Sequence, residues 1–334
     1  MKVLIIGGSR FLGRTLTEQL LKRNHDVTLF NRGQSNPSFQ ANIPAIIGDR
    51  ETQIENLGNQ TWDVVIDTCG YLPRIVELSA EYLKDKTHKY VFISSVSVYD
   101  ESKKVDQDEN APVIELEDKT TEDIMGEPNN YGGLKVLCER VVQDMYHNNS
   151  LIIRPGLIVG PHDPTNRFTY WPVRIRKGGA ILLPNNKSQH VQVIDVRDLA
   201  GFIVGLVEEN INGVFNVTGP HQPFSFESVI DSCIKVVGNT PSLIYAQEDW
   251  LLNNDVKPWM ELPLWLPEGS SVMDTNISKA IEAGLSFTPL KKTIEDTLNW
   301  YDDINGDSKE WSAGLSADKE LSLINTLTTK SSGN

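Results

Sequence analysis

The opening segment constrains the fold more than any other part of the chain. An apolar run from Lys2 to Ile6 enters a glycine-rich turn, and an amphipathic stretch follows it. This order predicts a strand, a turn and a helix. Such a turn brings backbone N–H groups and a helix N-terminus up to a pyrophosphate, with glycine where a side chain would block the approach. The candidate ligands of a dinucleotide are therefore the residues of the turn, Gly7, Gly8, Ser9, Arg10, Phe11, Leu12 and Gly13.

The rest of the first half alternates between apolar runs and helical patterns. Strands are predicted near residues 2–6, 26–30, 44–47, 63–67, 89–95 and 150–153, and helices at 12–23, 73–84 and 131–146. This alternation is typical of a parallel sheet with right-handed crossovers, and 334 residues leave length for a second lobe. We therefore expect an α/β fold, a Rossmann-type doubly wound parallel sheet with a smaller C-terminal substrate-binding lobe.

The expected domain boundaries follow from where the strand pattern stops and returns. The dinucleotide-binding domain is predicted at 1–165 plus 190–217, and the substrate lobe at 166–189 plus 218–310. Residues 311–334 become polar and are expected to form a tail with a mobile end. The acidic stretch from Asp100 to Pro128 has no strong period, so it is either a loop over the site entrance or a plain surface loop.

Tyr131 and Lys135 are the first candidate catalytic pair. Four residues separate them, which places a phenol and an ammonium on one face of a predicted helix. An ammonium nearby favours the tyrosinate and lowers the phenol pKa, so Tyr131 can give or take a proton. An isolated pair at this spacing is also common on ordinary surface helices. Other motifs are needed to distinguish a catalytic pair from a surface pair.

A run of serines supplies the second candidate group. The β-branched and aromatic segment from Tyr90 ends in Ser94, Ser95 and Ser97. Hydroxyls at the carboxyl end of a strand face the ligand crevice of a doubly wound sheet. Each serine alone is equally compatible with a turn, but the glycine turn, the serines and the Tyr131/Lys135 pair occur in the order that favours a catalytic site.

Taken together, these motifs resemble the extended short-chain dehydrogenase/reductases, also described as the NAD-dependent epimerase/dehydratase family. The resemblance continues through three later segments, 152–161, 193–200 and 213–219. It ends with the segment from Asp274 to Leu285, which is similar to the family's closing Asp-x-Ser-Lys-x-x-x-Leu-Gly pattern. It implies that Tyr131 is the general acid/base and that Lys135 lowers its pKa and bonds the nicotinamide ribose. It also implies that Ser95 holds the substrate oxygen, with Ser97 as a substitute, and that Pro155 packs near the nicotinamide. A homodimer through the helices that flank the sheet is a family expectation.

One departure from the family pattern concerns activity. The usual Gly-x-x-Gly-x-x-Gly has Arg10 in place of its middle glycine. This is similar to an atypical subgroup that includes chloroplast stem-loop-binding proteins as well as reductases. A non-catalytic dinucleotide-binding or RNA-binding protein therefore remains an alternative, although the chain retains Ser95, Tyr131 and Lys135.

The end of the second predicted strand indicates which dinucleotide binds. An NAD site normally places a carboxylate there, whereas an NADP site needs a positive group for the 2′-phosphate. Asn31 stands where the acid is expected and Arg32 follows it, so we predict NADP with NAD as the alternative. Asp49 and Arg50, just beyond the third predicted strand, complete the predicted cofactor site.

The substrate lobe offers aromatic side chains. The segment from Asp163 to Pro172 and a second run from Trp259 to Trp265 suggest a pocket that accepts a ring. Core packing is the competing interpretation of the second run. The predicted substrate residues are Phe168, Tyr170, Trp171 and Arg174. The stretch 188–193 lacks the Arg that typically holds a diphosphate in sugar-nucleotide members of the family, which argues against a sugar-nucleotide epimerase unless Arg174 or Arg176 takes its place.

Composition favours a cytoplasmic enzyme that acts on a small molecule. The chain has 45 acidic and 31 basic residues and a net charge of −14, which argues against nucleic acid as a partner. Cys69, Cys138 and Cys233 lack metal-ligand spacing and are expected to be reduced thiols. No apolar run reaches membrane-spanning length, and no metal site is predicted. We predict an NADPH-dependent reductase of a carbonyl compound, with an epimerase or dehydratase as the enzymatic alternative.

Overall fold

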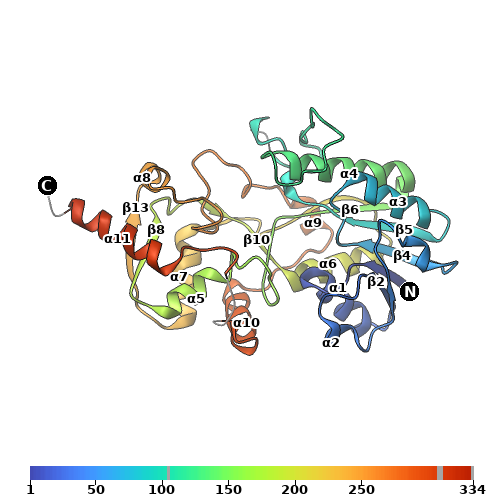
Figure 1. Cartoon of the computed structure of the whole chain (residues 1–334), viewed down its shortest axis with the longest axis horizontal. Helices are drawn as coiled ribbons and strands as arrows, with labels where there is room; N and C mark the ends of the chain where they lie inside the picture. Colours follow the sequence, from blue (N-terminus) through green and yellow to red (C-terminus); the bar gives the residue numbers. More distant parts are fainter. Residues whose placement is uncertain (104–105, 307–310, 332–334) are drawn as a thin grey trace. The chain divides into compact units, whose positions relative to one another are not determined.

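The computed structural model describes residues 1–103, 106–306 and 311–331 (Figure 1). The chain divides into two compact units. Unit 1 contains residues 1–158, 196–221 and 275–287, and unit 2 contains 159–195, 222–274 and the residues from 288 onward. Residues 275–287 thus belong to unit 1, although the predicted boundaries assign them to the substrate lobe. In this segment the carbonyl of Asn276 accepts a hydrogen bond from the side chain of Asn216 in the sheet.

Unit 1 is built on a seven-stranded sheet in the order β11-β6-β5-β4-β1-β2-β3. All its strand pairs run parallel, as predicted. The strands are β1 (Lys2–Ile6), β2 (Asp26–Asn31), β3 (Ala45–Ile47), β4 (Trp62–Asp67), β5 (Thr87–Ile93), β6 (Ser150–Pro155) and β11 (Gly213–Val217). Because parallel strands end at the same edge, the residues that follow β1, β2, β4, β5 and β6 gather along one border of the sheet.

Helices cover both faces of this sheet. The helix α1 packs against α6 on one face, and α3 packs against α4 on the other (Figure 1). The helices of unit 1 are α1 (Phe11–Lys22), α2 (Pro37–Gln40), α3 (Pro73–Leu83), α4 (Asn130–Tyr146), α6 (Val196–Glu208) and α9 (Ser278–Glu282). Short 3-10 turns lie at 54–57, 96–98, 101–103 and 147–149, and the short strand β7 spans Leu157–Val159. The bounds of α1, α3 and α4 agree with the predicted helices to within a residue or two at each end.

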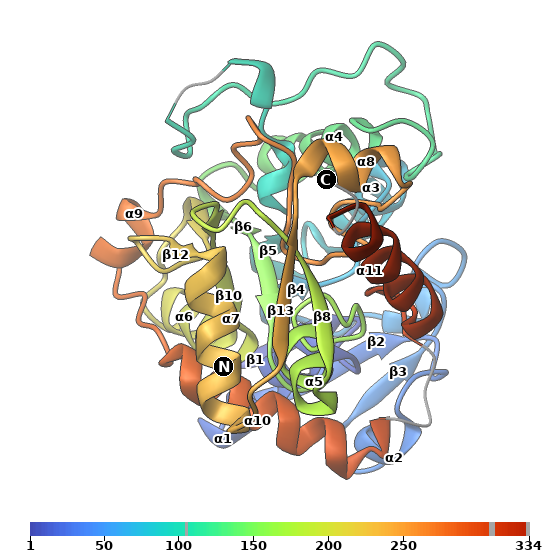
Figure 2. The same cartoon turned by 90° about the vertical axis from the view of Figure 1, so that its left-hand side faces the viewer.

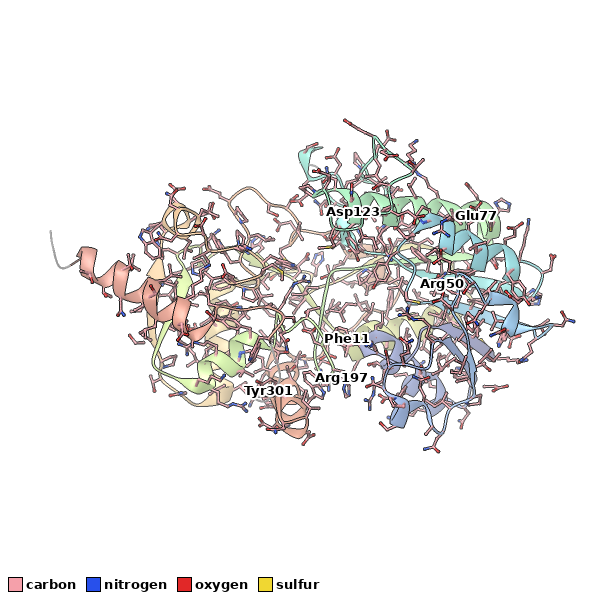
Figure 3. The ribbon with its side chains drawn as sticks, in the orientation of Figure 1. Phe11, Arg50, Glu77, Asp123, Arg197 and Tyr301 are labelled. Atoms are coloured by element: carbon pink, nitrogen blue, oxygen red, sulfur yellow. The ribbon has the colours of Figure 1, made fainter. Side chains whose placement is uncertain are left out.

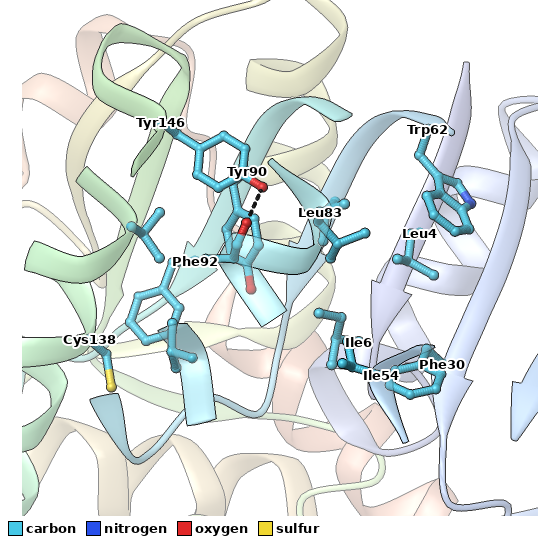
Figure 4. Close-up of a cluster of buried hydrophobic side chains, with 14 of the residues drawn as sticks. Leu4, Ile6, Phe30, Ile54, Trp62, Leu83, Tyr90, Phe92, Cys138 and Tyr146 are labelled. Carbon is cyan, nitrogen blue, oxygen red and sulfur yellow. Dashed lines mark hydrogen bonds between the residues drawn. The ribbon is translucent and has the colours of Figure 1, made fainter. Parts of the chain in front are cut away.

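The core of unit 1 lies between the sheet and the helices α3 and α4. Leu4 and Ile6 point to this face because alternate residues of a strand share a side, and Tyr90 and Phe92 follow the same rule (Figure 4). The rings of Tyr90 and Tyr146 lie 5.0 Å apart, which joins β5 to the end of α4. In β1, Val3 and Ile5 alternate with Leu4 and Ile6 and are also buried. Both faces of the strand are therefore covered, as in a sheet of this class.

Unit 2 combines a small parallel pair of strands with several helices. The strands β8 (Ala180–Pro184) and β13 (Ser242–Ala246) pair in register and lie side by side in Figure 2. The other strands are β9 (His190–Val191), β10 (Val193–Asp195) and β12 (Phe224–Ser225). The helices are α5 (Tyr170–Lys177), α7 (Phe226–Val237), α8 (Glu248–Asn253), α10 (Leu290–Asp303) and α11 (Ala317–Ser331).

The helix α11 lies where the sequence pattern predicts a tail. Its apolar residues are few, but Leu323 and Ile324 are buried, and Glu320 accepts a hydrogen bond from the backbone of Leu182. A polar segment with a short apolar stripe resembles a tail, because the local sequence does not show which surface the stripe covers. Among the described residues, no helix is both long enough and apolar enough to cross a membrane.

A buried ion pair joins β4 to the segment after β3. Arg50 donates from two nitrogens to the two carboxylate oxygens of Asp67, at 2.9 and 2.7 Å, and also to Ser79. The Tyr90 hydroxyl donates to the same carboxylate at 2.9 Å. Asp67 is fully buried, so its negative charge depends on these partners.

We expect Asp67→Asn to destabilise the protein by about 3 to 5 kcal/mol, because it leaves the buried Arg50 without a counter-charge. Urea unfolding of the variant and the wild type measures this difference. Glu122→Gln is the matched control, since Glu122 pairs with Arg74 on the surface. A control loss as large as that of Asp67→Asn would contradict the assignment of the cost to burial.

Candidate functional site

The glycine turn after β1 has the backbone shape that a phosphate site needs. Gly7 and Gly8 have φ values of +100° and +83°, which favour glycine. A Cβ on Gly13 would lie 2.9 Å from the backbone of Gly8, so this glycine allows the helix α1 to pass close to the turn. No side chain caps the N-terminus of α1, and its first N–H groups have no partners within the helix. The turn therefore fits a pyrophosphate group.

Phe11 and Arg10 occupy the centre of this turn. Phe11 begins α1 with a φ of +35° (labelled in Figure 3), a conformation that costs a residue with a side chain about 1 to 3 kcal/mol. Strain of this kind concentrates at ligand sites. Arg10 is exposed and directly precedes the helix, so its guanidinium is on the side of the turn that faces solvent.

The end of β2 uses Asn31 for the turn itself. Its amide donates to the carbonyl of Gly7 at 2.9 Å and accepts from the backbone of Gly33 at 2.8 Å. Arg32 extends outward, with a side chain 66% exposed and 4.0 Å from a carboxylate oxygen of Asp49. Asn31 thus shapes the glycine turn, and Arg32 is the residue at this strand end that stays open to a ligand. The roles of these residues toward a cofactor remain predictions.

Arg50 lies in a different environment from Arg32. Its guanidinium is bound to Asp67 and Ser79 and is only 11% exposed (labelled in Figure 3). Those contacts occupy the donors that a phosphate would need. The structure therefore gives Arg50 a structural partner, and the predicted contact with a cofactor has no support from its geometry.

Lys135 lies at the centre of the candidate catalytic site. Its ammonium donates to the carbonyl of Gly70, just beyond the end of β4, at 2.8 Å and to that of Ile93, the last residue of β5, at 2.6 Å. The side chain is only 3% exposed. Burial lowers the pKa of Lys135 from 10.5 to about 8. The residue therefore keeps its charge at neutral pH, and this charge is held against the sheet edge.

Tyr131 lies in the first turn of α4, one helical turn before Lys135, and is half-buried. Tyr71 is an additional neighbour that the sequence pattern did not identify. Its ring lies 5.3 Å from the Lys135 ammonium. The residue is 46% exposed, and desolvation of its packed part, followed by the charge of a nearby Tyr131, raises its pKa. The signal that could have found Tyr71 is its position shortly after a strand that ends at the same edge.

The serines that follow β5 form a short turn. The Ser95 hydroxyl accepts from the backbone N–H of Ser97 at 3.1 Å and donates to the Ser97 hydroxyl at 3.1 Å. Ser94 is 4% exposed, and its hydroxyl has no hydrogen-bond partner among the described residues. A Cβ on Gly132 would lie 1.9 Å from the carbonyl oxygen of Ser97, so this turn lies directly against the start of α4. The serines and Tyr131 are thus held on adjoining elements.

Pro155 is the last residue of β6 and is buried. It pairs in register with Val217 of β11, and the following Gly156 lies against Thr218, whose hydroxyl has no hydrogen-bond partner within the described part of the chain. The position of Pro155 at the edge of the sheet is compatible with its predicted contact with a nicotinamide, which stays a prediction.

The predicted substrate residues lie in unit 2 and are not displayed on an open surface. Phe168, Tyr170 and Trp171 are at most 4% exposed. Trp171 packs edge-on against Tyr170 and Phe226, and its ring nitrogen donates to the carbonyl of Pro263 at 2.7 Å. These contacts are those of a core, because each ring fills space between elements of unit 2. Their predicted contact with a substrate is not supported by the packing.

Arg174 is also engaged within unit 2. It forms an ion pair with Glu320 at 2.7 Å and donates to the carbonyls of Gly178 and Ala180 at 2.7 and 2.5 Å. With these partners, its guanidinium stabilises the end of α5. The described residues contain no cluster of His, Cys, Asp or Glu that could hold a metal ion. The three cysteines are free thiols.

Comparison with known proteins gives relatives of two kinds. A chloroplast stem-loop binding protein of 41 kDa from Arabidopsis thaliana is 29% identical over 257 residues, which is 71% of this chain and 63% of that protein. The chain thus spans less than two thirds of that relative's length. Among solved structures, the UDP-glucuronic acid 4-epimerase from Bacillus cereus in complex with NAD has a TM-score of 0.66 at 20% identity, covering 91% of this chain and 99% of that chain.

A second epimerase has the same fold. The UDP-N-acetylglucosamine 4-epimerase from Bacillus cereus has a TM-score of 0.65 at 14% identity, covering 90% of this chain and 99% of that chain. At these identities the likeness shows the fold, the Rossmann-type sheet with its second lobe. The sequence pattern of the NAD dependent epimerase/dehydratase family matches residues 3–218, more than half of the chain, and the chain therefore belongs to that family.

Proposed function

We propose that this protein binds a nicotinamide dinucleotide and catalyses hydride transfer at a substrate carbon that bears a hydroxyl or carbonyl group. The observation that carries this proposal is the buried ammonium of Lys135, held at the edge of the sheet one helical turn from Tyr131. The uncapped helix α1 and the open glycine turn at the same edge support the dinucleotide. Membership of the family is consistent with both parts.

In this proposal, the chain's own residues manage the proton. In the direction of reduction, the phenol of Tyr131 gives its proton to the carbonyl oxygen, and in the reverse direction the phenolate takes it back. The ammonium of Lys135 stabilises the phenolate, because an opposite charge nearby favours the charged form. Ser95 donates its hydroxyl proton to the substrate oxygen in place of Ser97, its present acceptor. The dinucleotide, when bound, supplies or accepts the hydride.

The overall reaction has two forms that share this chemistry. A reductase releases oxidised dinucleotide with each product, whereas an epimerase or dehydratase returns the hydride to the substrate. The family membership and the fold of sugar-nucleotide epimerases favour the second form at least as well as the first. Measuring oxidised dinucleotide per turnover decides between them: one equivalent indicates a reductase, and none indicates an epimerase or dehydratase.

A non-catalytic RNA-binding role is the third candidate, because the relative from Arabidopsis thaliana is named for stem-loop binding. The net charge of −14 weighs against a polyanionic partner, since such binding gains its affinity from Lys and Arg. RNA binding with a steep salt dependence, together with no dinucleotide binding, would replace the enzymatic proposal.

For the cofactor we propose NADP, with NAD as the competing ligand, and expect Arg32→Ala to separate them. Arg32 is exposed at the end of β2, where a guanidinium can bond a 2′-phosphate. We expect NADPH to bind the wild type more tightly than NADH, and the variant to lose about tenfold in NADPH affinity while its NADH affinity is unchanged. Nicotinamide fluorescence titrations measure both. Equal affinities in the wild type, unaltered in Arg32→Ala, would instead assign the site to NAD.

Tyr131→Phe tests the proton transfer. The variant removes the acidic hydroxyl and keeps the ring, so we expect kcat to fall by about 100-fold to 10,000-fold while dinucleotide affinity is maintained. The matched control is Tyr71→Phe, which removes a neighbouring phenol. Turnover with a substrate found by screening carbonyl compounds and sugar nucleotides gives the readout. Normal turnover by Tyr131→Phe would remove this residue from the mechanism.

The charge of Lys135 is testable through the pH dependence of stability. Its pKa in the folded state, about 8, lies below the value of 10.5 for the exposed group. Between these values the unfolded chain binds more protons, so this residue's contribution to the free energy of unfolding rises with pH. Lys135→Met lacks this titration. We therefore expect the free energy of unfolding of the wild type to rise by roughly 2 kcal/mol relative to that of Lys135→Met between about pH 7 and about pH 10, as measured by urea unfolding. A constant difference would show that the ammonium titrates as an exposed group.

A further inference from the structure

Glu139 continues the buried face of α4 that carries the proposed catalytic residues. Tyr131, Lys135 and Glu139 are spaced four residues apart and therefore share one side of the helix. Glu139 is 2% exposed, which is rare for a carboxylate unless it is paired. Its partner therefore determines how this side of α4 meets the sheet.

The partner is Arg154, on the strand β6. Its Nε donates to one carboxylate oxygen of Glu139 at 3.0 Å and its Nη2 donates to the other at 2.7 Å. Arg154 is itself 5% exposed, and β6 lies between β5 and β11 inside the sheet. The planar fork of an arginine accepts a carboxylate in one orientation, so this pair restricts rotation of α4 about its own axis.

The remaining nitrogen of the guanidinium holds other elements at the same point. Its Nη1 donates to the hydroxyl of Tyr99 at 3.0 Å and to the backbone carbonyl of Glu109 at 3.2 Å. The Tyr99 hydroxyl in turn donates to the side chain of Asn216 on β11 at 2.6 Å. One buried arginine thus connects α4, the segment after β5, the acidic stretch and two strands.

The first turn of α4 is held in a different way. Gly132 brings the backbone so close to Ser97 that a Cβ would clash with the carbonyl oxygen of that residue. Lys135 reaches its two carbonyls from between this contact and the Arg154–Glu139 pair. The helix is therefore held at two points, Gly132 and Glu139. A small rotation of α4 at Glu139 would displace the Tyr131 phenol and the Lys135 ammonium together.

We propose that Arg154, acting through Glu139, is a positioning residue that orients Tyr131 and Lys135 for proton transfer. This inference rests on the proposed function. An apolar pair of similar volume would serve stability as well, because buried ion pairs rarely exceed hydrophobic replacements in stability. The ion pair fixes the orientation of α4 about its axis, and proton transfer depends on placing the reacting groups within a fraction of an ångström.

The Lys135 ammonium reports on this placement without any ligand. Asp67 and Cys69 from the end of β4 and Cys138 and Glu139 from α4 raise the pKa of Lys135, and burial, the largest cause, lowers it. The ring of Tyr71, shortly after β4, also lies 5.3 Å from the ammonium. If α4 rotates and water reaches the ammonium, its pKa rises. If α4 stays in place and only the charge of Glu139 is lost, the pKa stays the same or falls.

The experiment uses the full chain with the double variant Arg154→Met/Glu139→Gln, which removes both charges together. We expect a cooperative urea transition at a lower midpoint than that of the wild type, because the Tyr99 hydroxyl and the Glu109 carbonyl lose their donor. We also expect dinucleotide affinity about tenfold weaker and an upward shift in the pKa of Lys135. The pKa is followed by NMR of lysine labelled at the side chain, with Lys135→Met to assign the signal. Arg154→Lys keeps the charge but loses the planar fork, and it replaces the double variant in this test if the double variant does not fold. We expect it to raise the pKa of Lys135 as well.

The control is Lys319→Met/Glu261→Gln, which removes a partly buried ion pair in unit 2. It should leave the Lys135 titration and dinucleotide binding unchanged. A stable Arg154/Glu139 variant with wild-type affinity and an unchanged or lower Lys135 pKa would overturn the inference, as would an unshifted titration in Arg154→Lys.

The inference and the proposed function fail in different ways. If the wild type binds neither NADPH nor NADH, the proposed function is wrong and the inference falls with it. If the dinucleotide binds and Tyr131→Phe loses turnover while the double variant behaves as the wild type, the inference alone is wrong.

Discussion

The contact on which the site depends is the hydrogen bonding of one buried ammonium to two strand ends. Lys135 satisfies the carbonyls of Gly70 and Ile93, which lie where β4 and β5 stop. A buried charge is tolerated only with such partners. Because those partners belong to the sheet, the helix α4 must pass close to it, and Gly132 makes that approach possible at Ser97. The position of Tyr131 follows from the same constraint.

Arginine has two different roles in this fold, because some arginines pair with buried carboxylates and others are exposed where a ligand can bind. Arg50 and Arg154 each hold a carboxylate with two nitrogens, Asp67 in one case and Glu139 in the other. Neither is open to a ligand, whereas Arg10 and Arg32 are exposed beside the glycine turn. A sequence pattern shows that an arginine follows a strand. Whether its guanidinium meets a phosphate or a neighbouring carboxylate is decided by side chains from other elements.

The substrate lobe illustrates the same limit. The aromatic segment around Tyr170 predicts a pocket for a ring, but its rings pack on one another and on Phe226. Aromatic side chains supply large apolar surface, so a dense run is equally suited to a core. The helix α11 was missed for a related reason. Its two buried apolar residues, Leu323 and Ile324, gain their role only from the surface they cover.

The sequence by itself determined the α/β class, the extents of six sheet strands and three helices, and the order of motifs that places Ser95, Tyr131 and Lys135 at one edge. These features are local or follow from parallel pairing, because period and turn residues act over a few positions. The tertiary structure decided which polar groups are already bonded, including Arg50, Arg174 and Asn31, and it revealed the pairing of Arg154 with Glu139. Those partners lie far apart in the chain, and no local pattern records a contact between side chains that only folding brings together.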